Sequence, residues 1–191
     1  MQHRSLLIQV VKRQVLKTLS KKGQNDFWGF RKSSAILQNL KVQCFILDKG
    51  EDIMKKSYKI AVAYLVFGLI AGVFAREVTK FTNFTGQTVM WLVHTHALVL
   101  GTAVFVLLPL FMKNFHIEEQ KSFKKFEWTY NIGLILTLGF MTVRGVTQLF
   151  ALPISSVVNS MISGFAGLGH IILTIGIVFL FQALFKSAEN N

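Results

Sequence analysis

The stretch VMWLVHTHALVLGTAVFVLLPLF, residues 89–111, decides the fold of this chain. Its 23 residues (111 − 89 + 1) are almost all apolar, and a helix needs about 20 residues to cross the hydrocarbon core of a bilayer. Because that core holds no water, every backbone N–H and C=O must bond within the segment, which predicts a helix. His94 and His96 lie inside this run. An ionisable side chain within a membrane span is costly, so we expect the function of the protein to involve this pair.

Apolar runs long enough to suggest membrane spans occur four times in the 191 residues, of which 52% are hydrophobic and 18 are Phe. The connections between these runs are short, so successive helices are expected to lie antiparallel in one transmembrane four-helix bundle. The predicted fold class is therefore an all-α polytopic membrane protein. The predicted spans are Ile60–Ala75, Thr88–Met112, Thr129–Phe150 and Met161–Phe185, and the predicted loops are Arg76–Gln87, Lys113–Trp128 and Ala151–Ser160.

The net charge of +12 does not indicate a nucleic-acid partner, because the positive charge lies in the segments that flank the spans and in the first 53 residues. With a cytoplasmic N-terminus, eight lysines of the transmembrane part fall on the cytoplasmic side, whereas Arg76 and Lys80 fall outside. This bias follows the positive-inside rule, with both termini in the cytoplasm. We therefore expect a multi-pass protein of the cell membrane, surrounded by lipid. The eight lysines are Lys55, Lys56, Lys59, Lys113, Lys121, Lys124, Lys125 and Lys186.

Residues 1–53 differ in composition from the rest of the chain. They hold 10 of the 21 Lys and Arg, 4 of the 9 Asp and Glu, and the only cysteine, Cys44. The other 138 residues (191 − 53) contain neither Asp nor Cys. The change falls at residues 49–56, KGEDIMKK, whose codons are compatible with a bacterial ribosome-binding site just ahead of Met54. We predict that Met54 is the true start, that 1–53 is a translated leader, and that 54–191 is the transmembrane domain.

Two alternatives concern processing of the N-terminal half. Residues 1–53 can instead be a genuine extension, in which Leu6–Lys22 alternates apolar and basic residues and forms an interfacial helix on anionic lipid. The basic start of the first span and its end at Val73-Phe74-Ala75 also imitate a secretory signal peptide. The 16 residues of Ile60–Ala75 (75 − 60 + 1) are slightly long for a signal core, so we predict an uncleaved span.

The ionisable residues within the spans are predicted to lie in one layer. Counted at about 1.5 Å per residue from the outer ends of the spans, His94, His96, Arg144 and His170 all fall in the outer half of the bilayer. Arg76 lies at the outer end of the first span. His94 and His96 are two residues apart, or about 200° around a helix, so they point in nearly opposite directions. They cannot hold one small ion together, but they can serve two sites.

This inventory favours a b-type haem between helices, which needs one or two imidazole ligands for iron and cations for its propionates. The predicted axial pair is His96 or His94 with His170, and arginines at the same level are expected to bind the propionates. A single cysteine excludes the Cys-x-x-Cys-His motif of covalent haem attachment. The candidate site residues are His94, His96, His170, Arg144 and Arg76, with His96 and His170 as iron ligands.

Other functions remain open. A non-enzymatic bundle, acting as a partner subunit or carrier, would use the histidines only for interhelical hydrogen bonds, worth about 0.6 kcal/mol each. A divalent-metal site would use His170 and one histidine of the pair. The glycines around His170, at 164, 167 and 169, allow close approach of either a helix or a flat ligand. Because the spans contain no nucleophile or carboxylate pair, we do not expect an enzyme.

The stretch His94-Thr95-His96-Ala97-Leu98-Val99-Leu100-Gly101 resembles the His-x-His helix of haem-copper oxidase catalytic subunits, whose paired histidines ligate two different haems. From Met54 onward the chain also resembles an uncharacterised family of four-span membrane proteins from low-GC Gram-positive bacteria. The oxidase resemblance covers one helix. The spans lack an adjacent His-His pair, a His-x-x-x-Tyr motif and embedded Asp, Glu or Lys. The resemblance therefore implies haem ligation by His94 or His96 and no more, and not oxygen reduction. The haem hypothesis itself predicts a role in electron transfer, haem handling or gas sensing, with a membrane redox partner or a second copy of the chain as partner.

Overall fold

The computed structural model describes Arg13 and residues 27–189, with side chains at Arg13 and at residues 50–189. The chain divides into two units, Met1–Asp52 and Ile53–Asn191. The predicted interfacial helix Leu6–Lys22 lies outside the described residues except for Arg13. Helix α2, Phe27–Phe81, begins in the first unit and supplies the first helix of the second.

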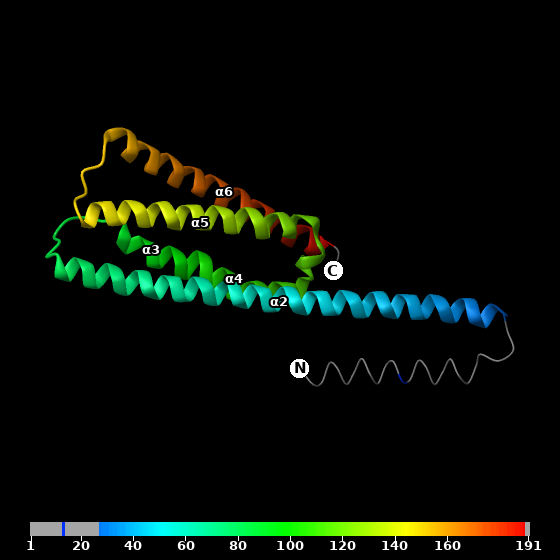
Figure 1. Ribbon diagram of the computed structural model, residues 1–191. Helices are drawn as coiled ribbons and strands as arrows, with labels where there is room; N and C mark the ends of the chain where they lie inside the picture. The colour runs from blue at the N-terminus through cyan, green and yellow to red at the C-terminus, as the bar shows by residue number, and fades with distance from the viewer. Residues whose placement is uncertain (1–12, 14–26, 190–191) are drawn as a thin grey trace. The chain divides into compact units, whose positions relative to one another are not determined.

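From Ile53 onward the described residues are helical, with no strand among them (Figure 1). Four helices are long and apolar enough to cross a membrane, which confirms the predicted all-α fold and fits a multi-pass integral membrane protein. The second of them, Met90–Phe115, is one continuous helix in which a π-helical segment separates two α-helical parts. After the end of α2, the elements are α3 (Met90–His96), the π-helix η1 (Ala97–Ala103), α4 (Val104–Phe115), the 3₁₀-helix η2 (Ile117–Glu119), α5 (Lys121–Leu149) and α6 (Ser156–Glu189).

Each helix is longer than the span predicted for it. Helix α2 continues to Phe81, so the predicted loop Arg76–Gln87 is wrong for its first six residues (81 − 76 + 1). The predicted loop Lys113–Trp128 shrinks to the segment between Phe115 and Lys121, and α6 starts at Ser156. An apolar run marks only the part of a helix that meets hydrocarbon. Polar turns at both ends continue the same backbone hydrogen bonds into the interface, which hydropathy does not detect.

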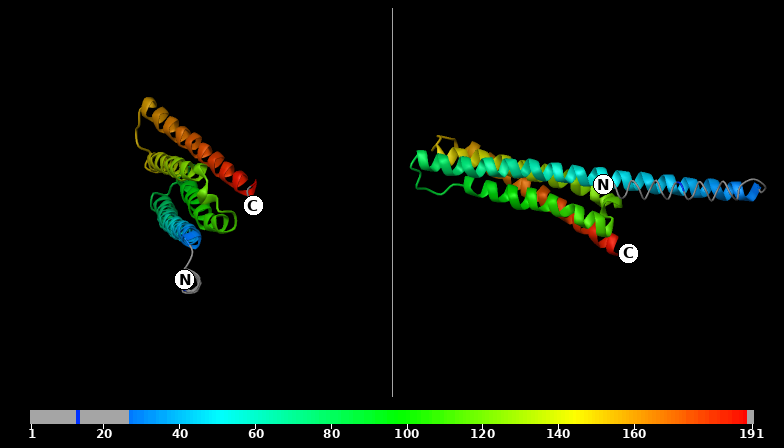
Figure 2. Two further views of the ribbon diagram at one scale, coloured as in Figure 1. Left: turned by 90° about the vertical axis from the view of Figure 1, so that its right-hand side faces the viewer. Right: turned by 90° about the horizontal axis from the view of Figure 1, so that it is seen from below.

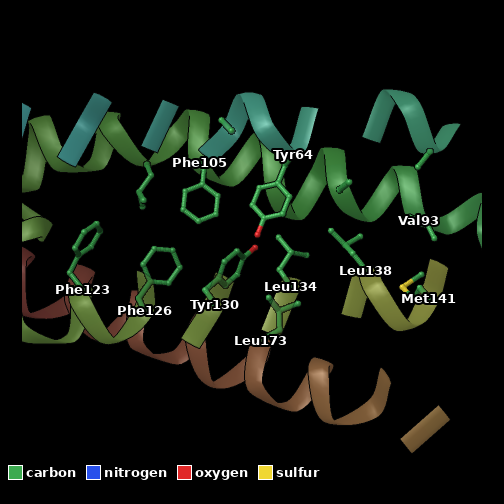
Figure 3. Packing of buried hydrophobic residues seen from close by; sticks show 14 of the residues in the cluster. Tyr64, Val93, Phe105, Phe123, Phe126, Tyr130, Leu134, Leu138, Met141 and Leu173 are labelled. Carbon is green, nitrogen blue, oxygen red and sulfur yellow. The ribbon is translucent and has the colours of Figure 1, made fainter. Parts of the chain in front are cut away.

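The helices lie in the order α2, α3–α4, α5, α6 across the second unit, and the two turned views in Figure 2 agree with Figure 1. Helix α5 packs along α6 on one side and against α3 and η1 on the other. The core between them is rich in aromatic side chains, which Figure 3 shows in two facing rows. Phe105 from α4 lies over Phe126 and Tyr130 from α5, with ring centroids 6.3 and 5.9 Å apart.

Glycines set the close crossing of α5 and α6. A Cβ atom at Gly133 would overlap the backbone nitrogen of Leu173. One at Gly169 would lie 2.7 Å from Thr137 Oγ1, and one at Gly176 would lie 2.8 Å from the backbone of Tyr130. Helices in lipid associate through van der Waals packing, and small residues allow their backbones to approach. The predicted contact role therefore holds for Gly169, whereas Gly164 and Gly167 have nothing within 4 Å of an added Cβ.

A proline in α4 is compensated by a serine in α2. Pro109 lies inside the helix and has no N–H, so the carbonyl of Phe105 loses its usual partner four residues ahead. The hydroxyl of Ser57 donates to that carbonyl at 2.8 Å. Ser57 is buried at 3% exposure, where an unpaired carbonyl would be costly. This bond joins the ends of the first two spans.

Candidate cofactor site

The helix that carries the two histidines changes its winding directly after them. His96 is the last residue of α3, and the next seven residues form the π-helix η1. π-Helical segments contain one extra residue per turn and are frequent at functional sites. The hydroxyl of Tyr130, on α5, donates to the Leu100 carbonyl within η1 at 2.8 Å. Gly101 lies against Tyr64 of α2, whose ring a Cβ atom would overlap.

The structure separates the two histidines as their spacing predicts. His94 lies against α2, since a Cβ atom at Gly72 would be 3.5 Å from Cβ and Cγ of His94. His96 instead lies near His170 of α6. Nδ1 of His94 is buried and has no hydrogen-bond partner among the described residues. One histidine therefore serves the contact between α2 and α3, and the other meets the last helix.

His96 and His170 form the pair that links the second and fourth spans. Their ring centroids are 6.3 Å apart and their planes are 85° to each other. Two imidazoles on opposite sides of one metal ion have centroids roughly 6 Å apart, because each metal–nitrogen bond is about 2 Å and each ring adds about 1 Å. Each ring can turn about its metal–nitrogen bond, so perpendicular planes suit such a pair. The separation therefore matches that of two axial ligands.

The hydrogen bonds of both rings fix the tautomer that a metal ligand needs. Nδ1 of His96 lies 2.9 Å from the Leu92 carbonyl, and Nδ1 of His170 lies 2.8 Å from the Ala166 carbonyl. A carbonyl oxygen can only accept, so each Nδ1 carries the proton and donates it. Nε2 is then the nitrogen with a free lone pair in the neutral ring. Metal-ligating histidines commonly donate the other N–H in this way, which orients the ring and raises its basicity.

Open space lies beside the pair on α6. His170 is exposed, and an added Cβ at Gly164 or Gly167 would meet nothing within 4 Å. His96 is half-buried. In Figure 1 the N-terminal half of α6 diverges from α5, while the C-terminal half lies close to it. The surface of α6 beside His170 at Gly164 and Gly167 is therefore open, and the approach of a flat ligand there stays a prediction.

Arg144 and Arg76 lie in different surroundings. Arg144 is half-buried on α5 and donates a hydrogen bond to Ser163 Oγ of α6. Ser163 is seven residues before His170, or about 10 Å along the helix. Arg76 is on α2, its side chain is 85% exposed, and its Nε lies 3.9 Å from Glu77 Oε1. Of the two arginines, only Arg144 bridges toward the helix that bears His170.

The donor set is limited to imidazoles. No group of three or more His, Cys, Asp or Glu suited to a metal ion occurs in the part of the chain that the structure describes. A structural zinc site takes four such ligands and a catalytic site three. A haem iron already has four ring nitrogens and takes one or two ligands from the protein.

Sequence reasoning missed the residues that support the site. Tyr130 orients η1, and the Tyr64 hydroxyl donates to Asn131 Oδ1 at 3.0 Å between α2 and α5. Gln148 accepts from the backbone N–H of Val89 at 2.8 Å and so holds the start of the second span. No pattern in the sequence points to these three residues, whereas Pro109 signals the need for a donor such as Ser57, because a proline within a span leaves a carbonyl without its usual partner.

A family of proteins described as of unknown function, DUF2871, matches residues 54–187. The match covers 134 (187 − 54 + 1) of the 191 residues. It begins at Met54, next to the boundary between the two units at Asp52 and Ile53. Neither a curated protein nor a solved structure matches the chain. On the strength of the four apolar helices and this match, the chain belongs to the DUF2871 family.

Proposed function

We propose that this membrane protein binds one b-type haem, with His96 and His170 as axial ligands of the iron. The observation that carries the proposal is the pair itself: two rings from different helices, 6.3 Å apart, each with Nδ1 bonded to a carbonyl of its own helix. A contact that only held the two helices together would not require Nε2 of both rings to keep a free lone pair. Haem supplies one-electron redox chemistry when it is bound.

The protein's own residues have separate tasks in this proposal. His96 and His170 hold the iron, and their Nδ1 bonds maintain the ligating tautomer. Arg144 is about 10 Å along α6 from His170 at Ser163, which suits a propionate at the edge of the ring. Exposed Phe165 and Leu168 add apolar surface on the same helix. His94 and Arg76 keep a role only if the haem also reaches the α2 side.

Haem held by both His96 and His170 would have no place left for a gas or a substrate. The proposal therefore favours electron transfer, or storage of an electron, over gas sensing and over catalysis. A membrane redox partner would follow, in the cell membrane of a bacterium and with both termini of the protein in the cytoplasm. This orientation rests on the distribution of lysines about the spans.

The alternative is a bundle whose histidines only stabilise helix contacts. It expects hydrogen bonds from these rings across to other helices. The bonds of His96 and His170 run along their own helices instead, to Leu92 and Ala166. His94 does not meet this expectation either, because its ring packs on Gly72 of α2 and its Nδ1 has no hydrogen-bond partner among the described residues. Interhelical hydrogen bonds therefore account for none of the three histidines in the part of the chain that the structure describes.

An optical spectrum of the full chain, purified in detergent after expression with added haem precursor, tests the proposal. We expect a Soret band that sharpens on reduction, and its loss in both His96→Ala and His170→Ala. His116→Ala is the matched control, because His116 is exposed in the loop before α5, at 59% for the side chain. A colourless protein that stays colourless after incubation with haemin would overturn the proposal, as would a Soret band unaffected by either variant.

A further inference from the structure

A groove between α2 and α5 is distinct from the histidine pair. Its volume is about 570 Å³, and it is open along one side. We call it the α2–α5 groove. Its walls are almost wholly apolar, and several of the side chains are strongly exposed, Ile135 at 61%. The apolar walls include Ile60, Ala63 and Phe67 of α2, and Ile135, Leu138 and Gly139 of α5.

The polar side chains in the groove already have hydrogen-bond partners within the protein. The Tyr64 hydroxyl donates to Asn131 Oδ1 at 3.0 Å, and Asn131 Nδ2 donates to the Glu127 carbonyl at 2.7 Å. Thr142, at the far end, donates to the Leu138 carbonyl at 2.7 Å. An occupant therefore needs no hydrogen-bonding group here. Because the surrounding medium is lipid, the matching chemistry is a hydrocarbon chain.

The length of the groove corresponds to one leaflet of a bilayer. From Asn131 to Thr142 there are 11 residues (142 − 131), which is about 16 Å of helix. Half of a hydrocarbon core is about 15 Å. A single acyl chain that lies parallel to the helices would therefore contact the walls of the groove along the whole depth of one leaflet.

Charged residues surround one end of the groove. Lys56 lies one turn before Ile60, and its Nζ is 3.2 Å from Glu127 Oε1, one turn before Asn131. The Lys56 side chain remains 57% exposed. Lys59 and Lys124 are exposed on the same ends of α2 and α5. Three lysines against one carboxylate leave an excess of positive charge, which favours an anionic headgroup.

We propose that the α2–α5 groove binds one acyl chain of an anionic phospholipid, whose phosphate lies among Lys56, Lys59 and Lys124. Trp128, 71% exposed at this end of α5, marks the level of the headgroups, where aromatic rings concentrate. The site is independent of the haem proposal, because neither His96, His170 nor Arg144 lines the groove.

Native mass spectrometry of the full chain, extracted from vesicles of equal parts phosphatidylglycerol and phosphatidylcholine with the same acyl chains, tests the proposal. We expect one retained phosphatidylglycerol per chain. Gly139→Leu should abolish this adduct, since an added Cβ there meets nothing within 4 Å and the side chain fills the groove without a clash. Gly164→Leu, which also enters open space but on α6, should retain it. Circular dichroism checks that both variants fold.

A double variant tests the recognition of the headgroup separately from that of the acyl chain. Lys59→Gln combined with Lys124→Gln should retain one lipid per chain but lose the preference for phosphatidylglycerol. Equal retention by wild type and Gly139→Leu would overturn the proposal, and so would loss from Gly164→Leu as well. A change of oligomeric state in Gly139→Leu alone would also overturn it, because the groove would then be a contact between copies of the chain.

Discussion

The Tyr130 hydroxyl donates a hydrogen bond of 2.8 Å to the Leu100 carbonyl, inside the π-helix that starts directly after His96. Tyr130 is 1% exposed, and Figure 3 shows its hydroxyl and that of Tyr64 pointing toward one another between the helices. A π-helix, whose backbone hydrogen bonds join residues five apart, is much rarer than an α-helix and occurs mostly as a short segment within one. A bond from a neighbouring helix therefore helps to keep the segment in the winding that directs His96 toward α6.

Tyr130→Phe should lower the thermal stability and disturb the orientation of His96. Removal of the hydroxyl leaves the Leu100 carbonyl without this donor, at a cost of about 1 kcal/mol. Thermal unfolding in detergent measures the loss, and the reduced haem spectrum reports any change of axial ligation. Tyr58→Phe is the control, because Tyr58 is 48% exposed. Identical unfolding curves for the two variants would contradict this role of Tyr130.

Ser57→Ala should destabilise the protein because Pro109 leaves the Phe105 carbonyl dependent on the serine hydroxyl. We expect a loss of about 1 to 2 kcal/mol. Pro109→Ala restores an N–H at that position, so Ser57→Ala should cost clearly less in the Pro109→Ala background. A double-mutant cycle by thermal or denaturant unfolding measures this coupling. An equal cost in both backgrounds would show that Ser57 acts in another way.

Two glycines of α5 should respond to alanine with opposite signs. Gly133→Ala places a methyl group on the backbone of Leu173, so it should separate α5 from α6 and cost about 1 to 3 kcal/mol. Gly139→Ala meets nothing within 4 Å and should stabilise the helix by up to about 1 kcal/mol through propensity. Unfolding of both variants under the same conditions is the measurement. Similar effects at the two sites would refute a tight crossing at Gly133.

Arg144 and Arg76 are distinguishable by their effect on bound haem. If haem binds as proposed, Arg144→Gln should weaken its retention and shift its reduction potential, because the cation proposed to bind a propionate is lost. Arg76→Gln should do neither, since its side chain is 85% exposed and lies by Glu77. Haem transfer to apomyoglobin and a redox titration provide the two readouts. If Arg76→Gln has the larger effect, the haem lies on the α2 side and His94 is its ligand.

Glu118 gives a pH dependence to the connection between α4 and α5. Burial raises the pKa of this carboxyl above its ordinary value, although its own backbone and His116 partly oppose the shift. The unfolded chain therefore loses the proton at lower pH than the folded protein. Stability is highest below the unfolded pKa and falls as pH rises through the folded pKa. Melting temperatures from pH 4 to 7 should show this slope in wild type and in the control Glu189→Gln, a somewhat smaller slope in Glu119→Gln because the Glu119 carboxylate contributes to the raised pKa, and the flattest slope in Glu118→Gln.

The sequence predicts the fold well because membrane insertion imposes a simple rule. Four apolar runs must be helices, and the structure has four helices able to cross a membrane. The ends of the helices were wrong, as at Arg76, because hydropathy reports the contact with lipid and not the last hydrogen-bonded turn. The opposite directions of His94 and His96 follow from helical geometry alone.

The partners of the histidines required the structure. Nothing in the spacing of residues distinguishes His96 from His94 as the neighbour of His170, because that choice depends on which helix lies on which side of α3. The π-helix is equally invisible in the sequence, since Ala97 to Ala103 are ordinary apolar and small residues. It depends on tertiary contacts from Tyr130 and Tyr64, each far away along the chain.

The π-helical winding of η1 absorbs about one residue more than an α-helix would for the same rotation between α3 and α4. If the seven residues wound as an ordinary α-helix with their number unchanged, α3 would turn by about 100° relative to α4. His96 would then face away from His170 while every side chain of the site was still present. Deletion of one residue, for example Val99, combined with α-helical winding should instead leave His96 facing α6, so relatives should pair the residue number of this segment with its winding.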